Sequence, residues 1–319
     1  MPPRKWHSFT GELRHFLSEI TAFTDTSASE LNLDSFRQNQ SHSPFPLVQN
    51  VTNPFAWPPH PGHESQTAPP ALSSPRSQVL VVIPARWGST RFPGKPLHLI
   101  AGKPLVQHVW ERCLSCAHVD QVVIATDDER IAYAARRFNA VPVLTDPNHP
   151  SGTDRVAETA QSFPKHSIII NVQGDEPLIS PALIDELAQT LQADPSIPMI
   201  TAAAPIEDEA HLQDPNVVKV VLDAKKDALY FSRSLIPYPR NPASGITTYR
   251  HLGIYGFQRE FLFQFVKWPP SPLEQTESLE QLRALENGAR IRVVPTKDLS
   301  PGVDTLEQAE ALEKVLLTH

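Results

Sequence analysis

Three cations lie within one glycine-containing stretch of the chain, residues 83–97, which reads IPARWGSTRFPGKPL. They are Arg86, Arg91 and Lys95, and the apolar run VLVVI leads into them. Guanidinium groups bind phosphate oxygens in bidentate pairs, and glycines allow a backbone to approach an anion closely. We interpret the stretch as an anion-binding loop at the end of a buried strand, with an ordinary solvated basic loop as the alternative.

Two common phosphate-binding motifs do not fit this loop. A Walker loop carries Ser or Thr after its lysine to bind Mg²⁺, whereas Pro96 follows Lys95 here. The five residues between Gly88 and Gly94 also exceed the Walker spacing by one. The dinucleotide-binding glycine motif carries no cations. The loop therefore binds its anion by another arrangement, and the local sequence leaves open whose phosphates it holds.

Carboxylates follow a second apolar run. In NVQGDEP, Asp175 and Glu176 come directly after a predicted strand, where carboxylates near a phosphate loop are suited to Mg²⁺. For Asp175 we favour a metal role over an acidic turn. In SPGVDTLEQ, by contrast, Asp304 and Glu307 precede an amphipathic run, and this local pattern favours an N-cap and capping box for Asp304.

Further polar side chains either bind a ligand or serve the fold alone. The segment SGTDR, residues 151–155, opens a predicted helix and either recognises a base edge or phosphate or merely caps that helix. Glu280 and Gln281 lie on a predicted helix, where charge is normally solvated. Other polar residues interrupt apolar strands and either line a pocket or are satisfied within a sheet: Arg233 in YFSR, and Arg250, His251 and Tyr255 in RHLGIYG.

Strands and helices alternate from Val79 onward. Runs such as VLVVIPA, QVVIATD, SIIINVQ and PMITAAAPI alternate with helical runs, which predicts an α/β fold with a mostly parallel sheet and helices on both faces. Its ligand belongs at the carboxyl ends of the strands. We expect one helix to begin in a capping box at Thr126 and Glu129, and another to run unbroken from Ser271 to Gly288. VVKVVLD, DALYFSRSLIP and HLGIYGFQ predict a small β-rich insertion with a hairpin.

The bulk composition divides the chain and excludes several classes of protein. Residues 1–78 are rich in Pro, Ser, His, Asn and Gln, so we predict a disordered N-terminal extension that activity does not require. Residues 79–319 form the predicted folded domain. The net charge of −7 argues against a general nucleic-acid binder. No apolar run reaches the ~20 residues of a membrane span, so we expect a cytoplasmic protein.

Two cysteines, Cys113 and Cys116, are spaced as C-x-x-C late in a predicted helix. A thioredoxin-like motif would need an exposed helix start, and a zinc site would need a second pair of ligands. We predict two reduced cysteines without a redox or metal role.

A series of motifs resembles one known family when the motifs are taken in chain order. They are VVIPARWGSTRFPGKPL, ATDD, SGTDR, NVQGDEP, VKVVLD, ALYFSR, RHLGIYG, PSPLEQTESLEQLR and GVDT. From about Val79 to Leu316 the chain resembles the 3-deoxy-manno-octulosonate cytidylyltransferases, also called CMP-KDO synthetases. Sialic-acid cytidylyltransferases share the basic loop, but not NVQGDEP together with RHLGIYG and LEQLR.

The resemblance implies a Rossmann-like nucleotidyltransferase fold, with the insertion used for sugar binding and dimerisation, and a role for each matching residue. It implies that Asp175 and Asp304 hold Mg²⁺, which overrides the local interpretation of Asp304 as a cap; with Arg86 and Lys95 they are the expected catalytic residues. The positions implied for CTP are Arg86, Ser89, Arg91, Lys95, Ser151, Gly152, Thr153 and Gln173. The positions implied for the sugar acid are Arg233, His251, Tyr255, Glu280 and Gln281.

The resemblance also implies the reaction. CTP and 3-deoxy-manno-octulosonate (KDO) would give CMP-KDO and pyrophosphate in a cytoplasmic homodimer that serves lipopolysaccharide synthesis, with no histidine needed as general base. Two alternatives stay open: a cytidylyltransferase for 8-amino-KDO or sialic acid, and a catalytically silent nucleotide-binding module. The chain departs from the family at Trp87, where tyrosine is common, in a shorter loop before RHLG, and in its N-terminal extension.

Overall fold

The computed structural model describes residues 76–88, 92–241, 245–299 and 301–317. The predicted extension over residues 1–78 lies almost wholly outside this part, so its disorder and its dispensability stay predictions. Within the described residues, no helix combines the length and the apolar character needed to cross a membrane.

The described chain alternates strands and helices, as expected. The strands of the main sheet are β1 (Gln78–Ala85), β4 (Gln121–Thr126), β5 (Val141–Leu144), β6 (His166–Asn171), β7 (Met199–Pro205), β10 (Tyr249–Gln258) and β11 (Ile291–Pro295). Two hairpins add β2 (Leu99–Ile100) with β3 (Lys103–Pro104), and β8 (Lys219–Leu222) with β9 (Ala228–Ser232). The helices are η1 (Lys95–Leu97, a 3-10 turn), α2 (Leu105–Leu114), α3 (Glu129–Arg137), α4 (Gly152–Gln161), α5 (Pro181–Ala193), α6 (Glu209–Gln213), α7 (Arg259–Phe265), α8 (Pro272–Glu277), α9 (Gln281–Glu286) and α10 (Leu306–Leu316).

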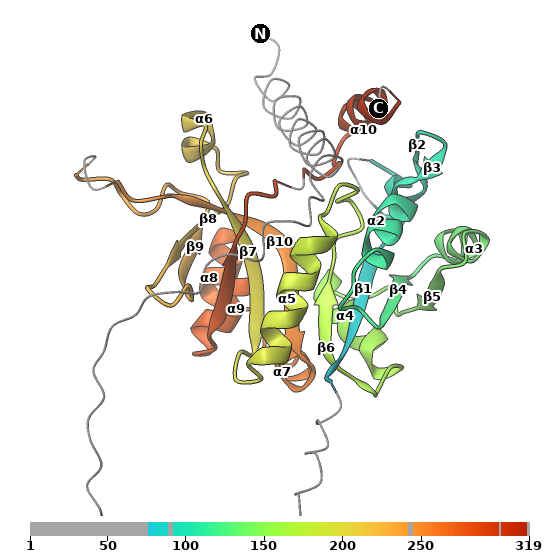
Figure 1. Ribbon diagram of the computed structural model, residues 1–319, viewed down its shortest axis with the longest axis horizontal. Helices are drawn as coiled ribbons and strands as arrows, with labels where there is room; N and C mark the ends of the chain where they lie inside the picture. The colour runs from blue at the N-terminus through green and yellow to red at the C-terminus, as the bar shows by residue number, and fades with distance from the viewer. Residues whose placement is uncertain (1–75, 89–91, 242–244, 300, 318–319) are drawn as a thin grey trace, which may run out of the picture. The chain divides into compact units, whose positions relative to one another are not determined.

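The main sheet is mostly parallel, which confirms the predicted fold class. Its strand order is β11-β7-β10-β6-β1-β4-β5 (Figure 1). β1 pairs in parallel with β4 and β6, and β11 pairs in parallel with β7. β10 runs antiparallel between β6 and β7. Because parallel strands end at the same edge of a sheet, the loops after β1 and β6 emerge side by side.

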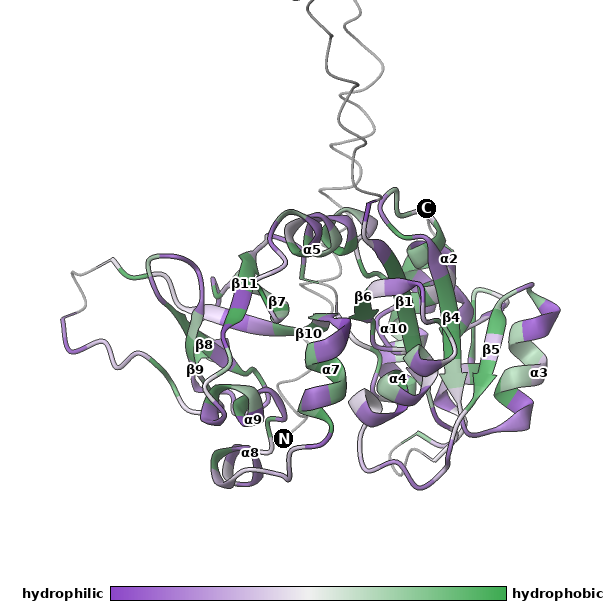
Figure 2. Cartoon of the chain, turned by 90° about the horizontal axis from the view of Figure 1, so that it is seen from below, coloured by the Kyte–Doolittle hydropathy of each residue, from purple (hydrophilic) through white to green (hydrophobic). Residues whose placement is uncertain are grey.

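Helices cover both faces of the sheet, which explains why β1 reads as an unbroken apolar run. Val79, Val81 and Ile83 face one apolar cluster with residues of α2, α3 and α5, whereas Leu80 and Val82 face another with residues of α4, α7 and α9. A strand covered on both sides needs no polar alternation. Figure 2 shows β1, β4 and β6 as apolar strands in the middle of the fold.

The predicted β-rich insertion and its hairpin are present, and their third strand also belongs to the main sheet. β8 and β9 form the hairpin, and β8 also pairs with the first residues of β10. β10 then continues into the centre of the main sheet, so its residues belong to both parts. Lys219 at the start of β8 is buried, and its ammonium donates to the carbonyls of Asp214, Val217 and Arg233 at 3.0, 2.7 and 2.7 Å.

Two expected helix boundaries are wrong. Thr126 ends β4, and its buried hydroxyl accepts the N–H of Asp128, which is the actual N-cap of α3. The strand pairing extends through Thr126, so the helix cannot begin there. The helix expected from Ser271 to Gly288 has the predicted capping box but breaks into α8 and α9 at Ser278, which has φ 52°.

Asp304 is not a helix cap either. Thr305 caps α10 in a capping box with Gln308, one residue later than the local pattern predicts. This leaves the Asp304 carboxylate outside the helix. Cys113 lies in α2 and Cys116 just beyond its end; both are free thiols, and burial raises the pKa of Cys116 to about 12.

Candidate functional site

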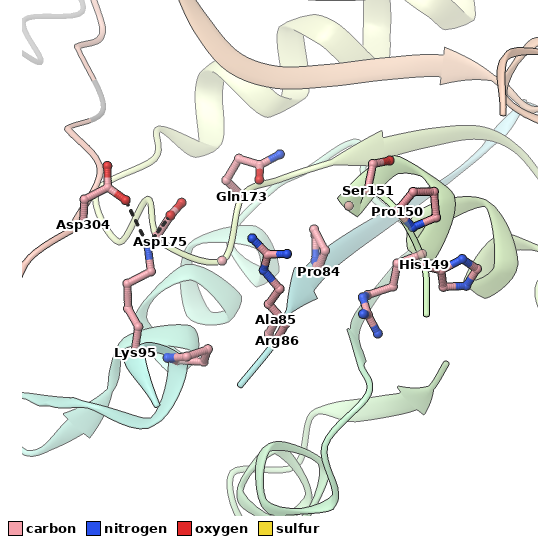
Figure 3. A pocket seen from close by; sticks show the side chains of 14 residues that line it. Pro84, Ala85, Arg86, Lys95, His149, Pro150, Ser151, Gln173, Asp175 and Asp304 are labelled. Atoms are coloured by element: carbon pink, nitrogen blue, oxygen red, sulfur yellow. Dashed lines mark hydrogen bonds and ion pairs between the residues drawn. The ribbon is translucent and has the colours of Figure 1, made fainter. Parts of the chain in front are cut away.

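A pocket of about 360 Å³ lies at the carboxyl ends of β1 and β6, where the topology rule places a ligand (Figure 3). At one end of the view stand Lys95, Asp175 and Asp304; at the other stand His149, Pro150 and Ser151, with Arg86 and Gln173 between them. The described residues that line it are Pro84, Ala85, Arg86, Lys95, Pro96, His149, Pro150, Ser151, Gly152, Arg155, Gln173, Gly174, Asp175 and Asp304.

The floor of the pocket depends on a close approach between the ends of two strands. A Cβ atom added to Gly174 would lie 2.8 Å from the carbonyl oxygen of Pro84, which real Cβ atoms essentially never do. The turn after β6 therefore needs glycine at this position. Asp175 follows directly, and its carbonyl accepts the N–H of Val303 at 2.8 Å. This backbone bond brings the segment before α10, and with it Asp304, to the mouth of the pocket.

Lys95 links the two predicted metal-binding carboxylates. Its ammonium donates to Asp175 Oδ2 at 2.6 Å and to Asp304 Oδ1 at 3.1 Å. The Lys95 side chain is 14% exposed and that of Asp304 53%, so the charges meet at the rim of the pocket. The structure thus brings together three of the four residues expected to be catalytic, with Arg86 along the same pocket.

Asp175 and Asp304 fit a magnesium ion only when phosphate oxygens of a bound substrate complete its coordination. Within the described part of the chain, no three His, Cys, Asp or Glu side chains come together as a metal site. Mg²⁺ is usually held by one or two carboxylates, together with substrate phosphates and waters. Asp175 and Asp304 share one cation already, so the pair has the charge and spacing to share another.

The predicted nucleotide residues mostly line the pocket. Ser151 is the N-cap of α4, where its hydroxyl oxygen accepts the N–H groups of Thr153 and Asp154, so the capping role also left open in the sequence is present. Thr153 differs, because its hydroxyl donates to Glu280. Ser89 and Arg91 lie outside the described residues, and their roles stay predictions.

Two polar lining residues received no individual role in the sequence interpretation. His149 contacts Glu158 through Nε2, and nothing in its local sequence marks it as a site residue. Arg155 is 4% exposed and donates to Asp127 at 2.9 Å and to the hydroxyl of Thr145. Its place at the end of SGTDR was the available signal, but its partners are far away in sequence.

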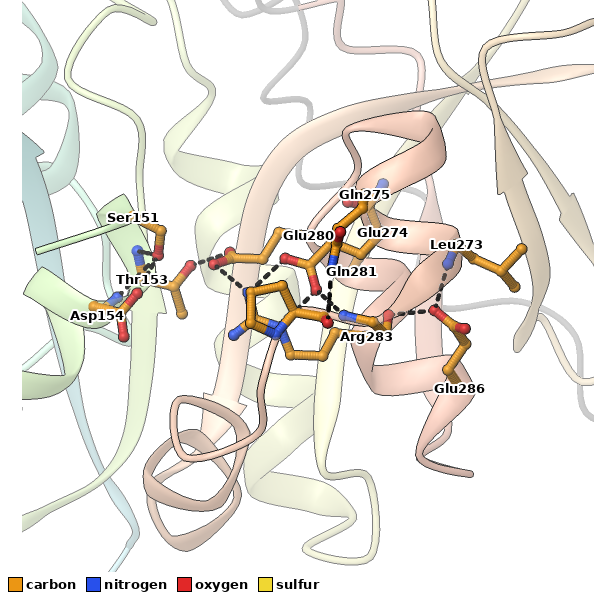
Figure 4. A network of polar contacts seen from close by, with 12 residues as sticks. Ser151, Thr153, Asp154, Leu273, Glu274, Gln275, Glu280, Gln281, Arg283 and Glu286 are labelled. Atoms are coloured by element: carbon orange, nitrogen blue, oxygen red, sulfur yellow. Dashed lines mark hydrogen bonds and ion pairs between the residues drawn. The ribbon is translucent and has the colours of Figure 1, made fainter.

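Four of the five predicted sugar residues form a second group beside the first. Tyr255 donates through its hydroxyl to Gln281 Oε1 at 3.2 Å, and its ring lies 5.4 Å from that of His251. Glu280 accepts from Thr153 and so joins α9 to the start of α4, as Figure 4 shows. Among the described residues, Gln281 Nε2 is buried and has no hydrogen-bond partner. We call His251, Tyr255, Glu280 and Gln281 the inner cluster.

Burial shifts the pKa values of the inner cluster toward the neutral forms of its side chains. It lowers the pKa of His251 to about 3 and raises the pKa of Glu280, against the lowering effect of the hydrogen bond from Thr153. It also raises the pKa of Tyr255, with a smaller contribution from the charge of Glu280. His251 Nε2 contacts the hydroxyl of Thr201 at 2.9 Å.

Arg233 stands apart from the inner cluster. Its guanidinium donates to the carbonyls of Glu277, Pro215 and Ser278 at 2.6, 3.0 and 3.3 Å. These bonds hold the break between α8 and α9. The structure therefore places Arg233 at the break between α8 and α9, which precedes Glu280 in the chain.

Glu176 is an unexpected feature next to Asp175. Burial, followed by the charge of Asp175, raises the pKa of Glu176 to about 8. A Cβ atom added to Gly253 of β10 would lie 3.5 Å from Oε1 of Glu176. The two acidic residues of NVQGDEP therefore differ: Asp175 faces the pocket, and Glu176 packs against β10.

Sequence comparisons show the family to which the chain belongs. A model of the family described as Cytidylyltransferase matches residues 80–291. The 3-deoxy-manno-octulosonate cytidylyltransferase of Pseudomonas syringae is 51% identical over 248 residues, covering 74% of this chain and 97% of its own. The enzyme of the same name from Synechococcus elongatus is 48% identical over 233 residues, covering 73% of this chain and 96% of its own.

Solved structures extend the likeness to three dimensions. A CMP:2-keto-3-deoxy-manno-octonic acid synthetase complexed with CTP matches with a TM-score of 0.73 at 44% identity, covering 76% of this chain and 99% of that chain. The 4-diphosphocytidyl-2C-methyl-D-erythritol synthase of Anaerococcus prevotii matches with a TM-score of 0.53 at 12% identity, over 76% of this chain and 96% of that chain. The second match shows a shared fold alone.

Proposed function

The chain belongs to the 3-deoxy-manno-octulosonate cytidylyltransferase family, and we propose that it transfers CMP from CTP to the anomeric hydroxyl of KDO, releasing pyrophosphate. The observation that carries this proposal is that one pocket gathers Arg86, Lys95, Gln173 and Asp175 at the strand ends. A cytidylyltransferase must hold a triphosphate and a base in one groove, and the pocket offers charge at one end and helix-start groups at the other.

In the proposed reaction the anomeric oxygen of KDO bonds to the α-phosphorus of CTP. The bond from that phosphorus to the bridging oxygen breaks, pyrophosphate leaves with the electron pair, and the hydroxyl proton passes to solvent. Such a step asks the protein for positioning and charge neutralisation. Arg86 and Lys95 would bind the triphosphate, with Lys95 exchanging a carboxylate partner for a phosphate oxygen.

Asp175 and Asp304 would hold Mg²⁺ together with phosphate oxygens. Bound there, Mg²⁺ would polarise the α-phosphate and lower the pKa of the attacking hydroxyl. Gln173 and the start of α4 would contact the cytidine, and the inner cluster would receive the sugar acid. The contact of Thr153 with Glu280 would keep the two halves of the site in register.

We also propose a homodimer that acts in the cytoplasm in lipopolysaccharide synthesis. Support for the dimer comes from exposed apolar residues on the insertion and the segment after it: Leu229, Tyr238 and Ile246 are 61%, 81% and 56% exposed. Contiguous exposed apolar patches mark protein interfaces, and we propose that these three side chains form part of one. Sedimentation of the chain would test the dimer directly.

The decisive experiment is pyrophosphate release from CTP and Mg²⁺ with and without KDO, beside UTP, ATP, 8-amino-KDO and sialic acid. Release that requires both CTP and KDO is expected. Release with CTP and another acid sugar would keep the nucleotide half of the proposal and change the sugar. No release with any pair, despite CTP binding, would favour a silent nucleotide-binding module.

A further inference from the structure

Trp87 lies in the basic loop between two functional cations, and the proposed reaction gives it no role. Its carbonyl accepts the N–H of Gly94 at 3.3 Å, which ties together the two arms of the loop. Gly94 has φ +71°, and a Cβ atom added there would lie 2.9 Å from Cη2 of Trp87. The indole therefore lies against Gly94, the residue immediately before Lys95.

The indole also meets α3. The Arg130 Cζ atom lies 3.4 Å from the centroid of the Trp87 ring. Arg130 is itself fixed, because its Nε and Nη2 donate to both carboxylate oxygens of Asp128 at 2.9 and 2.6 Å. Asp128 is in turn the N-cap of α3, bonded through its N–H to the hydroxyl of Thr126. A chain of contacts thus runs from the end of β4 to the basic loop.

We propose that Trp87, in contact with both Gly94 and Arg130, is a positioning residue that orders Arg86 and Lys95 for the triphosphate of CTP. Arg86 is exposed and precedes Trp87 directly, while Lys95 follows the glycine that the indole covers. A contact that orders the loop before the anion arrives lowers the entropy cost of binding. The stack with Arg130 provides that contact, and it depends on an aromatic face.

This inference rests on the proposed function, because it names CTP as the anion. The test is therefore direct binding of CTP with Mg²⁺, measured by calorimetry, followed by KM values for CTP and KDO. The variants are Trp87→Ala, Trp87→Tyr, Arg130→Ala and the double variant Trp87→Ala/Arg130→Ala. Arg136→Ala is the matched control, since Arg136 lies on the same helix and pairs with Glu129 at 3.8 Å.

We expect Trp87→Ala to weaken CTP binding about tenfold and Arg130→Ala about threefold, in line with the loss of a cation–π contact and of the preformed loop. The double variant should bind about as Trp87→Ala does, because the two residues act through one contact. Trp87→Tyr should recover most of the affinity. The KM for KDO and the thermal midpoint should stay within twofold and within about 3 °C of wild type.

The outcomes separate this inference from the proposed function. If wild type binds CTP and Trp87→Ala binds equally well, the positioning role is wrong and the proposed function stands. Additive losses in the double variant, or equal rises in KM for CTP and KDO, would also overturn it. Failure of wild type to bind CTP would overturn the proposed function together with this inference.

Discussion

The mouth of the pocket and the inner cluster hold their polar groups by opposite means. At the mouth, Lys95 lies between two carboxylates that solvent reaches, so charge is balanced by charge. In the inner cluster, burial drives His251 toward its neutral form and hydrogen bonds join Glu280 and Gln281 to neighbouring elements. The first arrangement suits a ligand whose charge changes during a reaction. The second suits recognition of a fixed pattern of hydroxyl groups.

The largest effect should come from removing charge at the mouth. Asp304→Asn keeps the shape of the side chain but weakens the site for Mg²⁺, so we expect kcat to fall about a thousandfold with little change in stability. Pyrophosphate release measures the rate. Glu310→Gln on the exposed side of α10 is the matched control and should behave as wild type. Near-normal turnover of Asp304→Asn would remove Asp304 from the metal site.

Lys95 and Lys219 should respond in opposite ways to the loss of their charge, one in activity and the other in stability. Lys95→Met should lower kcat/KM for CTP about a hundredfold while the free energy of unfolding changes by less than about 1 kcal/mol. Lys219→Met should instead cost about 2 kcal/mol of stability, because three carbonyls lose their donor. Urea unfolding and steady-state rates measure both.

Lys225→Met, in the exposed turn between β8 and β9, controls for loss of a lysine charge. If Lys95→Met unfolded more easily than Lys219→Met, the division between a functional and a structural lysine would be reversed.

The mouth was the more predictable region, because two of its residues come soon after the ends of strands. Asp175 follows β6 and Arg86 follows β1, and strand ends are visible as the limits of apolar runs. Asp304 was misread locally because Asp304 and Thr305 are adjacent and both make good caps. Asp304 reaches the pocket through two long-range hydrogen bonds, from Val303 to Asp175 and from Lys95 to Asp304. The bonded residues are too far apart in sequence for a local pattern to predict them.

The inner cluster was predictable only by resemblance. Its residues come from β10 and α9, which meet because β10 inserts antiparallel into the middle of a parallel sheet. Neither apolar periodicity nor turn residues specify that pairing. The break at Ser278, which sets the direction of α9, depends on the distant guanidinium of Arg233. Such positions follow from tertiary contacts that override local helix propensity.

The hydrogen bond between Thr153 and Glu280 joins the nucleotide half of the site to the inner cluster, and changing it should have a smaller effect on the KM values. Glu280→Gln keeps the size of the side chain and removes its charge, so we expect the KM for KDO to rise about tenfold and the KM for CTP less than threefold. Thr153→Val, which removes the hydroxyl from the same contact, should act in the same direction. Glu286→Gln, which lies farther along α9, is the comparison for a charge lost on that helix. Equal rises for both substrates would mean that the cluster does not separate from the nucleotide half.

The smallest effect concerns the pH dependence of stability. Because burial lowers the pKa of His251 in the folded state to about 3, the unfolded chain binds a proton there that the folded chain does not. Stability from this group is complete above the ordinary histidine pKa and is lost as pH falls toward 3.

Because the His251 ring is partly exposed, we expect half of the full linkage over this range, a loss of stability of about 1 kcal/mol between pH 6.5 and 5. His251→Gln, which keeps a donor for Thr201 but does not titrate, should lack this loss in urea unfolding. Parallel curves for both proteins would show that His251 is as easily protonated in the folded chain as in the unfolded chain, and would contradict the lowered pKa.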